Sequence, residues 1–337
     1  MYLTYILSPL INNNIYMSKT KKKCKHINKK HNKSDKKSQR LKEIKLEQNI
    51  KNRKINKITK EIEAKFIEFY VNYINDNYPN LLTYNNLRKF ILKEILEDII
   101  YFLKSGVSYK NFRGKLSKST LHYYISLFTK KNIFISNYWC LHKEYSKNNF
   151  YDKIKYLSTD TTFIINKSSS LKNVKRNPYM KNKNCIKISY LADKEGIPLD
   201  IMIKTGNLND SPMLREHLTN LKIDIKTKEL KNNNRYKQYF LADGIYNSTK
   251  NINFLKEKGF IPILSPNKRN SHTEPVQLTN NEKIIYKKRI IVENAFAKLK
   301  QYKRINNLYE KRISVYTSLV YLSLSHTLFK KMNIINN

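Results

Sequence analysis

Hydrophobic residues change their spacing near residue 150 of the chain. Between about residues 61 and 145 they recur every three or four positions, which is the spacing of amphipathic helices. From about residue 150 onward, short runs in which apolar and polar residues alternate indicate strands, and helical segments separate these runs. The pattern therefore predicts an all-α region followed by a mixed α/β region.

The first region has the element order of a helix-turn-helix module. A helix is expected over residues 83–104, ended by Gly106, and a short helix over residues 108–112, before Gly114. The apolar side of the first helix is formed by Leu87, Phe90, Ile91, Ile95, Ile99 and Leu103. Ser117 is expected to cap a last helix, whose apolar positions are Leu121, Tyr124, Ile125 and Phe128.

The last helix of a helix-turn-helix module enters the major groove of DNA. Lys118, Ser119 and His122 are expected to face outward near its N-terminus, where contacts to base edges are made. A small helical bundle with another role has the same pattern, so that alternative stays open at this point.

The second region predicts three antiparallel strands, a helix, a strand, a helix, a strand and a final helix. These elements are expected at residues 153–165, 185–193, 196–204, 211–221, 237–243, 248–259, 260–264 and 281–305. Asp210 or Ser211 is expected to cap the first of the three helices. This is the element order of a ribonuclease H-like fold.

Three acidic residues occupy positions that need an explanation in a chain with few acids. Asp160 lies in the middle of the first strand, Asp243 ends the fourth strand, and Glu293 lies in the apolar pattern of the final helix. Each one alone is compatible with a structural role such as a cap or an ion pair. Three carboxylates that converge from these elements can hold two Mg²⁺ ions, which prefer oxygen ligands and catalyse phosphoryl displacement in pairs.

Cationic and phenolic residues share the face of the final helix that carries Glu293. At 100° per residue, Tyr286, Arg289, Glu293 and Lys300 fall within about 60° of arc, and Arg304 returns to the same face. Such a face can hold metal through the carboxylate and DNA phosphates through the cations. Ordinary intrahelical ion pairs on a lysine-rich helix are the alternative.

The formal net charge of +40 indicates a polyanionic partner, and nucleic acid is the usual one. The abundance of Lys, Asn, Ile and Tyr is typical of AT-rich coding DNA, which accounts for part of this charge. Residues 18–60 form a basic, low-complexity stretch without apolar periodicity, so we expect a disordered arm over residues 1–60.

Three cysteines lie far apart and form no metal-binding spacing or disulfide framework, which fits a reducing compartment. Residues 1–11 lack a basic stretch and a cleavage site, so no secretory signal is expected, and Met17 is an alternative start to Met1. Residues 314–329 are too short and too polar to span a bilayer, and a buried helix is expected there.

Four segments of the chain resemble the DDE transposases of bacterial insertion sequences. The spacing Y-x2-R-x3-E-x6-K at Tyr286, Arg289, Glu293 and Lys300 matches the YREK signature of that family. LSTDTTFI resembles its first-aspartate block, LADGIYNS its second, and GNLNDSPML the block between them. The preceding helical region is similar to the DNA-binding region that these enzymes place before the catalytic domain.

The resemblance implies a DNA transposase that cleaves the element's ends and joins the freed 3′-OH to target DNA. It implies Asp160, Asp243 and Glu293 as ligands of two Mg²⁺ ions, which Mn²⁺ can replace, and Tyr286, Arg289 and Lys300 as supporting DNA contacts. The partner is double-stranded DNA, synapsis implies a homodimer, and the site of action is the nucleoid or cytoplasm of a prokaryote or the nucleus of a eukaryote.

We accordingly expect a helical DNA-binding domain over residues 61–145 and a catalytic domain over residues 150–332. The second block departs from the family at Gly244, Ile245 and Asn247, and the middle block has Asn209 where the family has His. None of these departures removes a carboxylate. Two alternatives stay open, namely a transposase-derived DNA-binding protein without activity and a ribonuclease H-like nuclease without strand transfer.

Overall fold

The computed structural model describes residue 48 and residues 57–81, 91–147, 150–167, 171–172, 174–221, 237–267 and 277–335. The chain forms two compact units, residues 1–61 and residues 62–337, and the second unit contains the sheet and nearly all the described helices. The arm expected over residues 1–60 lies outside the described residues, apart from residue 48 and the helical residues 57–60.

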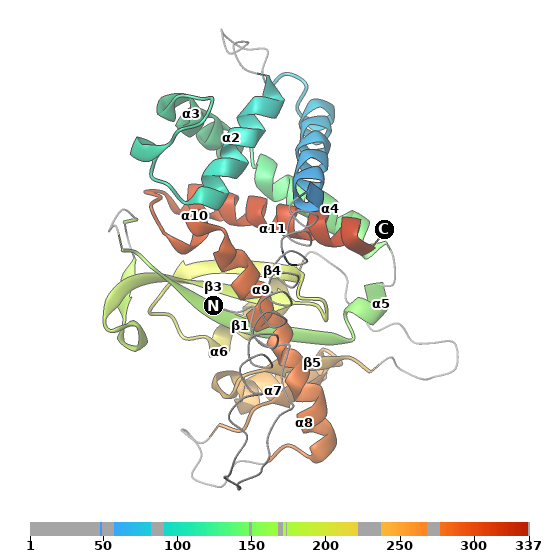
Figure 1. The fold of residues 1–337 in the computed structure, drawn as a ribbon. Coiled ribbons are helices and arrows are strands. Elements are labelled where there is room, and N and C mark those ends of the chain that lie inside the picture. Colours follow the sequence, from blue (N-terminus) through green and yellow to red (C-terminus); the bar gives the residue numbers. More distant parts are fainter. Residues whose placement is uncertain are drawn as a thin grey trace, which may run out of the picture. The chain divides into compact units, whose positions relative to one another are not determined.

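The helical region begins with a helix over residues 57–77, followed by α2 (Leu92–Ser105), η2 (Tyr109–Asn111), α3 (Lys118–Lys130) and α4 (Ile133–Ser146) (Figure 1). Gly106 ends α2 in the left-handed conformation, with φ of 65°. Ser117 caps α3, because its side chain accepts a hydrogen bond of 3.2 Å from the backbone N–H of Thr120. Both capping predictions are therefore confirmed.

The predicted apolar side of α2 is only partly correct. Ile95, Ile99 and Leu103 are buried as expected, but Ile91 precedes the helix as its N-cap and is 66% exposed. The helix begins after Ile91, so the helical spacing does not extend back to this residue. Leu87 and Phe90 lie outside the described residues.

Strands β1 (Tyr156–Ile165), β3 (Lys183–Ala192), β4 (Pro198–Thr205), β5 (Tyr239–Ala242) and β6 (Ile261–Leu264) form one mixed sheet, with the short β2 (Lys175–Asn177) beside β3. The strand β3 pairs antiparallel with β1, β2 and β4, whereas β5 pairs parallel with both β1 and β6. The path β4-β3-β1-β5-β6 is consistent with the ribonuclease H-like fold that the sequence predicted.

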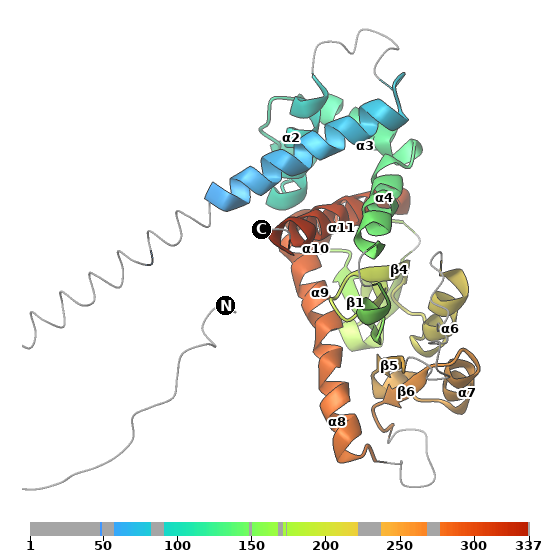
Figure 2. The ribbon, with the colours of Figure 1, turned by 90° about the vertical axis from the view of Figure 1, so that its right-hand side faces the viewer.

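Helices cover both faces of the sheet (Figure 2). On one face, α6 (Ser211–Asn220) and α7 (Thr249–Glu257) pack on a cluster that includes Leu157, Leu191, Leu214, Phe240 and Leu255. On the other face lie α9 (Ile290–Gln301) and α11 (Ile313–Ile335), which share one apolar core with the helical region. The remaining short elements are α5 (Phe150–Lys153), η3 (Pro178–Met180), η4 (Gly244–Tyr246), α8 (Asn280–Tyr286), η5 (Lys287–Arg289) and α10 (Lys303–Asn306).

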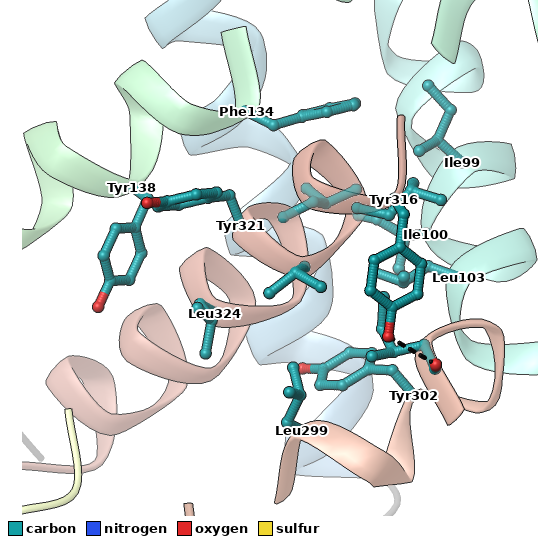
Figure 3. Packing of buried hydrophobic residues seen from close by; sticks show 14 of the residues in the cluster. Ile99, Ile100, Leu103, Phe134, Tyr138, Leu299, Tyr302, Tyr316, Tyr321 and Leu324 are labelled. Carbon is teal, nitrogen blue, oxygen red and sulfur yellow. Dashed lines mark hydrogen bonds between the residues drawn. The ribbon is translucent and has the colours of Figure 1, made fainter. Parts of the chain in front are cut away.

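The helix α11 joins the helical region to the sheet. Tyr138 of α4 packs edge to face on Tyr321 of α11, with ring centroids 5.5 Å apart (Figure 3). The hydroxyl of Tyr138 also donates a hydrogen bond of 2.6 Å to the carbonyl of Pro198 in β4. Residues 314–329 thus form part of a buried helix, as expected. Among the described residues, no helix is both long and apolar enough to cross a membrane.

Candidate active site

Asp160 of β1 and Asp243, the residue that follows β5, lie equally far past the paired part of these two parallel strands. The last residue pair in the parallel register of β1 and β5 is Ser158 with Leu241, and each aspartate follows its member of that pair by two residues. Residues in register on parallel strands point to the same face of a sheet. The fold therefore places two carboxylates side by side where β5 ends, at the edge where open α/β sheets carry their chemistry.

The two aspartates are held in the same way by the backbone that follows them. The N–H of Thr161 donates to Oδ1 of Asp160 at 2.8 Å, and the N–H of Gly244 donates to Oδ1 of Asp243 at 2.6 Å. These bonds fix the carboxylates and direct the second oxygen of each away from the local backbone. Asp160 is largely shielded from solvent, whereas Asp243 is exposed.

Arg289 connects the first carboxylate to the third. Its Nη1 donates to Oδ2 of Asp160 at 2.9 Å, and its Nη2 donates to Oε1 of Glu293 at 2.5 Å. The guanidinium also lies 5.7 Å from the ring centroid of Tyr286. Arg289 therefore links two other residues of the predicted helix face, Tyr286 and Glu293, to Asp160 of β1.

The charges at this point influence one another. Burial raises the pKa of Asp160 above its ordinary value, against the lowering effects of the Thr161 N–H and Arg289, while the negative charge of Asp243 raises it further. Burial acts to lower the pKa of Arg289, but Tyr286 and the three carboxylates together raise it. All three predicted acids are therefore close enough to act on the same guanidinium.

The donor set suits a hard divalent cation, since it consists of carboxylate oxygens. In the described part of the chain, however, no group of three or more His, Cys, Asp or Glu side chains lies close enough together to hold a metal ion. Arg289 occupies the space between Asp160 and Glu293 and satisfies one oxygen of each. The residues fit Mg²⁺ by chemistry, and they require Arg289 to move before the carboxylates can share it.

The final helix is not one regular element. The segment from α8 to α9 contains the 3-10 turn η5, and the helix ends at Gln301 because Tyr302 takes an extended conformation with ψ of 100°. Lys300 lies in the last turn of α9, where burial lowers its pKa. The predicted face therefore extends to Lys300 but not beyond Tyr302.

The sequence predicted Arg304 as a DNA contact, and the structure shows that this prediction is wrong. Its side chain is fully buried, its Nε donates to Glu310 at 2.8 Å, and its Nη1 donates to the carbonyl of Val107 at 2.8 Å. The guanidinium lies over the ring of Phe102, 4.2 Å from its centroid. Arg304 is thus a structural residue that joins α10 to the helical region, and it is not available to DNA.

The three residues predicted at the start of α3 are exposed, as expected. Lys118, Ser119 and His122 lie on the outer side of this helix. The hydroxyl of Ser119 lies 2.9 Å from that of Ser117, and the ring of His122 packs edge to face on Tyr109 of η2, at 5.2 Å. The structure leaves Lys118 and His122 open to solvent and engages Ser119 at the helix cap.

A buried hydrogen-bonded chain that the sequence analysis missed lies beneath Asp160. His217 of α6 is fully buried, with Nδ1 2.6 Å from Oδ2 of Asp200 and Nε2 2.7 Å from Oγ of Ser189. Ser189 Oγ in turn lies 3.4 Å from the backbone carbonyl of Asp160. The alternation of apolar and polar residues predicted β3 and β4. Nothing in the sequence indicated that Ser189 of β3 and Asp200 of β4 both contact His217.

The block GNLNDS is organised by two contacts that its sequence only partly indicates. Asp210 does not cap α6 through its side chain but pairs with the buried Lys187 at 2.5 Å, while Asn209 accepts from the N–H of Ser211 at 3.0 Å. Gly206 approaches β3 so closely that a Cβ would lie 2.2 Å from Sγ of Cys185. Gly206 and Asp210 of the block therefore have structural roles, the first in close packing on Cys185 and the second in the ion pair with Lys187.

The comparison with known families agrees with this geometry. The family model of the transposase DDE domain matches residues 157–328, which is just over half of the chain and contains all three carboxylates. No curated protein matches the chain. The match begins in β1, ends in α11 and includes all of the sheet except Tyr156, so the chain belongs to the family of transposase DDE domains.

Proposed function

We propose that this protein is a transposase of the YREK-signature group that cleaves DNA at the ends of its element and transfers the freed 3′-OH to target DNA. The family implies transposition-related DNA cleavage and strand transfer in general, which are phosphoryl transfers. The observation that supports the finer proposal is that Asp160 and Asp243 each lie two residues past the last β1–β5 pair, with Arg289 linking Asp160 to Glu293.

In this proposal Asp160, Asp243 and Glu293 hold two Mg²⁺ ions, which Mn²⁺ can replace and which activate the attacking oxygen and stabilise the leaving oxygen. Arg289 leaves the carboxylates and pairs with a phosphate of the DNA, for which its planar fork is suited. Tyr286 and Lys300 contribute further contacts along the same helix. No covalent bond forms between the protein and the DNA.

The helical residues 61–145 would bind the element's ends through Lys118, Ser119 and His122, and residues 150–332 would carry the catalysis. The basic residues 1–60 would add contacts to DNA phosphates. Two ends must be brought together before transfer, so we propose that a homodimer acts. These assignments extend the family membership and are tested separately from it.

The test uses donor DNA with the sequences that flank the gene, purified full-length protein, and Mg²⁺ or Mn²⁺. We expect metal-dependent cleavage and joining with the wild-type protein, and loss of both with Asp243→Asn or Glu293→Gln. Glu257→Gln is the matched control, because Glu257 is also an exposed helical glutamate but lies at the end of α7. Full activity of the Asp243 and Glu293 variants would overturn the assignment.

The same experiment separates the alternatives. Cleavage without joining under every condition would indicate a nuclease, and tight binding of the flanking DNA without cleavage would indicate a DNA-binding protein. Each result contradicts the proposed activity while leaving the fold and the family unchanged.

A further inference from the structure

The strands β2 and β3 form a two-stranded ribbon that extends beyond the rest of the sheet. The strand β2 pairs with β3 from Lys183 to Cys185. On β3, the register with β1 ends at Cys185 and the register with β4 ends at Ile186. Beyond β1, the N–H of Asn166 still donates to the carbonyl of Asn184 at 2.9 Å. Residues 178–183 therefore lie past the last bonded positions of both neighbouring strands, and they form the free end of the ribbon.

Buried polar contacts fix the end of this ribbon. Asn177 is buried, its Nδ2 donates to the carbonyl of Gly206 at 2.5 Å, and its Oδ1 accepts from the N–H of Tyr179 at 2.8 Å. Lys181 and Asn182 both have positive φ, of 53° and 55°, as in the tight turns that match the twist of a β-hairpin. The backbone at Tyr179 is therefore held in place before any partner binds.

The surface of the ribbon combines one aromatic ring with four cations. Tyr179 is 76% exposed, the largest exposure among the large hydrophobic and aromatic residues of the described chain. The exposed cations of the ribbon are Lys175, Arg176, Lys181 and Lys183. None of these four forms a salt bridge with an acidic residue in the part of the chain that the structure describes.

We infer that this ribbon binds double-stranded DNA in the major groove, with the four cations on phosphates and the ring of Tyr179 against base edges. A two-stranded ribbon fits the width of the major groove. Cations without acidic partners bind phosphates with release of condensed counterions, and this release favours association. Phosphate binding alone needs no exposed aromatic ring. The exposed ring of Tyr179 at the fixed end of the ribbon therefore supports an additional apolar contact with the bases. The inference rests on the proposed function for its substrate, a DNA duplex.

The position of the ribbon agrees with a duplex that also reaches the carboxylates. Asp160 precedes Ile165, the residue of β1 opposite Cys185, by five positions in one strand. At about 3.3 Å per residue this is roughly 17 Å, or about five base pairs of duplex. The ribbon would therefore contact the duplex several base pairs from the phosphodiester that is cut.

The test measures binding of the full-length protein to a fluorescent duplex of about three helical turns and, separately, to one of its single strands. Binding is measured without divalent metal and at several salt concentrations. Changing the four cations to Gln is expected to lower the slope of log K against log salt by about one per cation. Tyr179→Ala is expected to weaken binding about tenfold, whereas Tyr179→Phe should bind like the wild type. The matched control changes Lys143, Lys237, Lys256 and Lys258 to Gln, which removes the same charge from exposed positions on other elements.

Three results would overturn the inference. An unchanged slope for the ribbon variant, or a change equal to that of the control, shows that the ribbon does not bind phosphates. Wild-type affinity of Tyr179→Ala shows that the tip makes no contact with the bases. Loss of single-stranded binding with unchanged duplex binding assigns the ribbon to a single strand.

Failure of the proposed function is distinguishable from these results. Because binding is measured without metal, an inactive wild-type protein whose ribbon variants lose duplex affinity contradicts only the catalytic proposal. An active protein whose ribbon variants bind normally contradicts only the inference about the ribbon.

Discussion

Arg289 donates a hydrogen bond of 2.9 Å from Nη1 to Oδ2 of Asp160, across 129 residues of sequence. This contact ties the final helical segment to the central strand of the sheet. The same guanidinium holds Glu293, one turn further along the helix, so the arginine sets the distance between two proposed metal ligands. Its side chain is 18% exposed, which leaves it a path toward solvent and DNA.

The first prediction concerns Arg289 itself. Arg289→Lys keeps the positive charge but loses the fork that reaches two oxygens at once, and Arg289→Gln also loses the charge. We expect both variants still to bind metal but to cleave DNA more slowly than the wild type. The cleavage rate of Arg289→Gln should be about a hundredfold below that of the wild type. Lys287→Gln, an exposed neighbour in η5, is the control. Cleavage rates measured at saturating DNA decide the point, and equal rates for all four proteins would contradict it.

A second prediction follows from the buried chain of Asp200, His217 and Ser189. Removing the imidazole in His217→Ala leaves a mostly buried carboxylate and a buried hydroxyl without their partner. We expect a loss of about 2–4 kcal/mol in the free energy of unfolding. The exposed His122→Ala should change it by less than about 0.5 kcal/mol. Urea unfolding of the two variants and the wild type measures the difference.

The elements of this fold were predictable where one face of an element is apolar. The periodicity of α3 and the caps at Ser117 and Gly106 depend on local sequence, and the structure confirms them. The alternation in β3 and β4 predicted these strands correctly, although residues 185–192 of β3 are all buried, which alternation does not predict. The boundary of α2 was predicted less well, because Ile91 is apolar but lies before the first turn. An apolar residue indicates burial only if the backbone already has the helical conformation.

The candidate site was predictable in its residue types and their order, but not in its contacts. Nothing in the sequence gives the register of β1 and β5, which brings Asp160 beside Asp243. The helical wheel placed Arg289 and Glu293 on one face correctly, since helical backbone continues from α8 to Gln301. It failed at Arg304, because Tyr302 leaves the helical conformation and the chain turns inward.

The third prediction tests the corrected role of Arg304. Its guanidinium is buried between Glu310 and the ring of Phe102, so Arg304→Met removes the cation that faces the buried carboxylate of Glu310. We expect Arg304→Met to cost about 3–5 kcal/mol of stability. The double variant Arg304→Met with Glu310→Leu should recover part of this loss, because it also removes the buried negative charge that Arg304 neutralises.

Lys311→Met is the control for Arg304, since Lys311 is exposed and close in sequence. Urea unfolding gives the free energies of the three variants. A second measurement compares DNA binding at temperatures where the double variant is folded, and there the salt dependence should equal that of the wild type. A weaker salt dependence of DNA binding in the double variant would show that Arg304 does contact DNA.

The fourth prediction uses the pH dependence of stability, and it concerns Asp193 in the turn between β3 and β4. Asp193 is fully buried. Its carboxylate accepts a hydrogen bond of 2.7 Å from the hydroxyl of Tyr145 and hydrogen bonds of 2.9 Å from the backbone N–H groups of Glu195 and Ile197. Burial raises its pKa to about 6, against the lowering effects of these hydrogen bonds and of Lys331.

A carboxyl whose pKa is higher in the folded state than in the unfolded state stabilises the fold in its protonated form. The contribution is present in full below pH 4 and is lost as the pH rises through 6, and it amounts to about 3 kcal/mol. Asp193→Asn keeps Oδ1 for the two N–H groups and cannot ionise. We therefore expect the stability of the variant relative to the wild type to increase by about 2 kcal/mol between pH 4 and pH 7.

Glu195→Gln provides a control of opposite sign. Burial acts to raise the pKa of Glu195, but its ion pair with Lys331, 2.8 Å long, helps to lower it below the ordinary value. This contribution is present above the pKa of the unfolded state and is lost as the pH falls, so the glutamine variant should lose stability relative to the wild type as the pH rises. Urea unfolding of the three proteins from pH 4 to pH 7 measures both slopes. Parallel curves for the wild type and Asp193→Asn would show that Asp193 is ionised in the folded protein at both ends of this range.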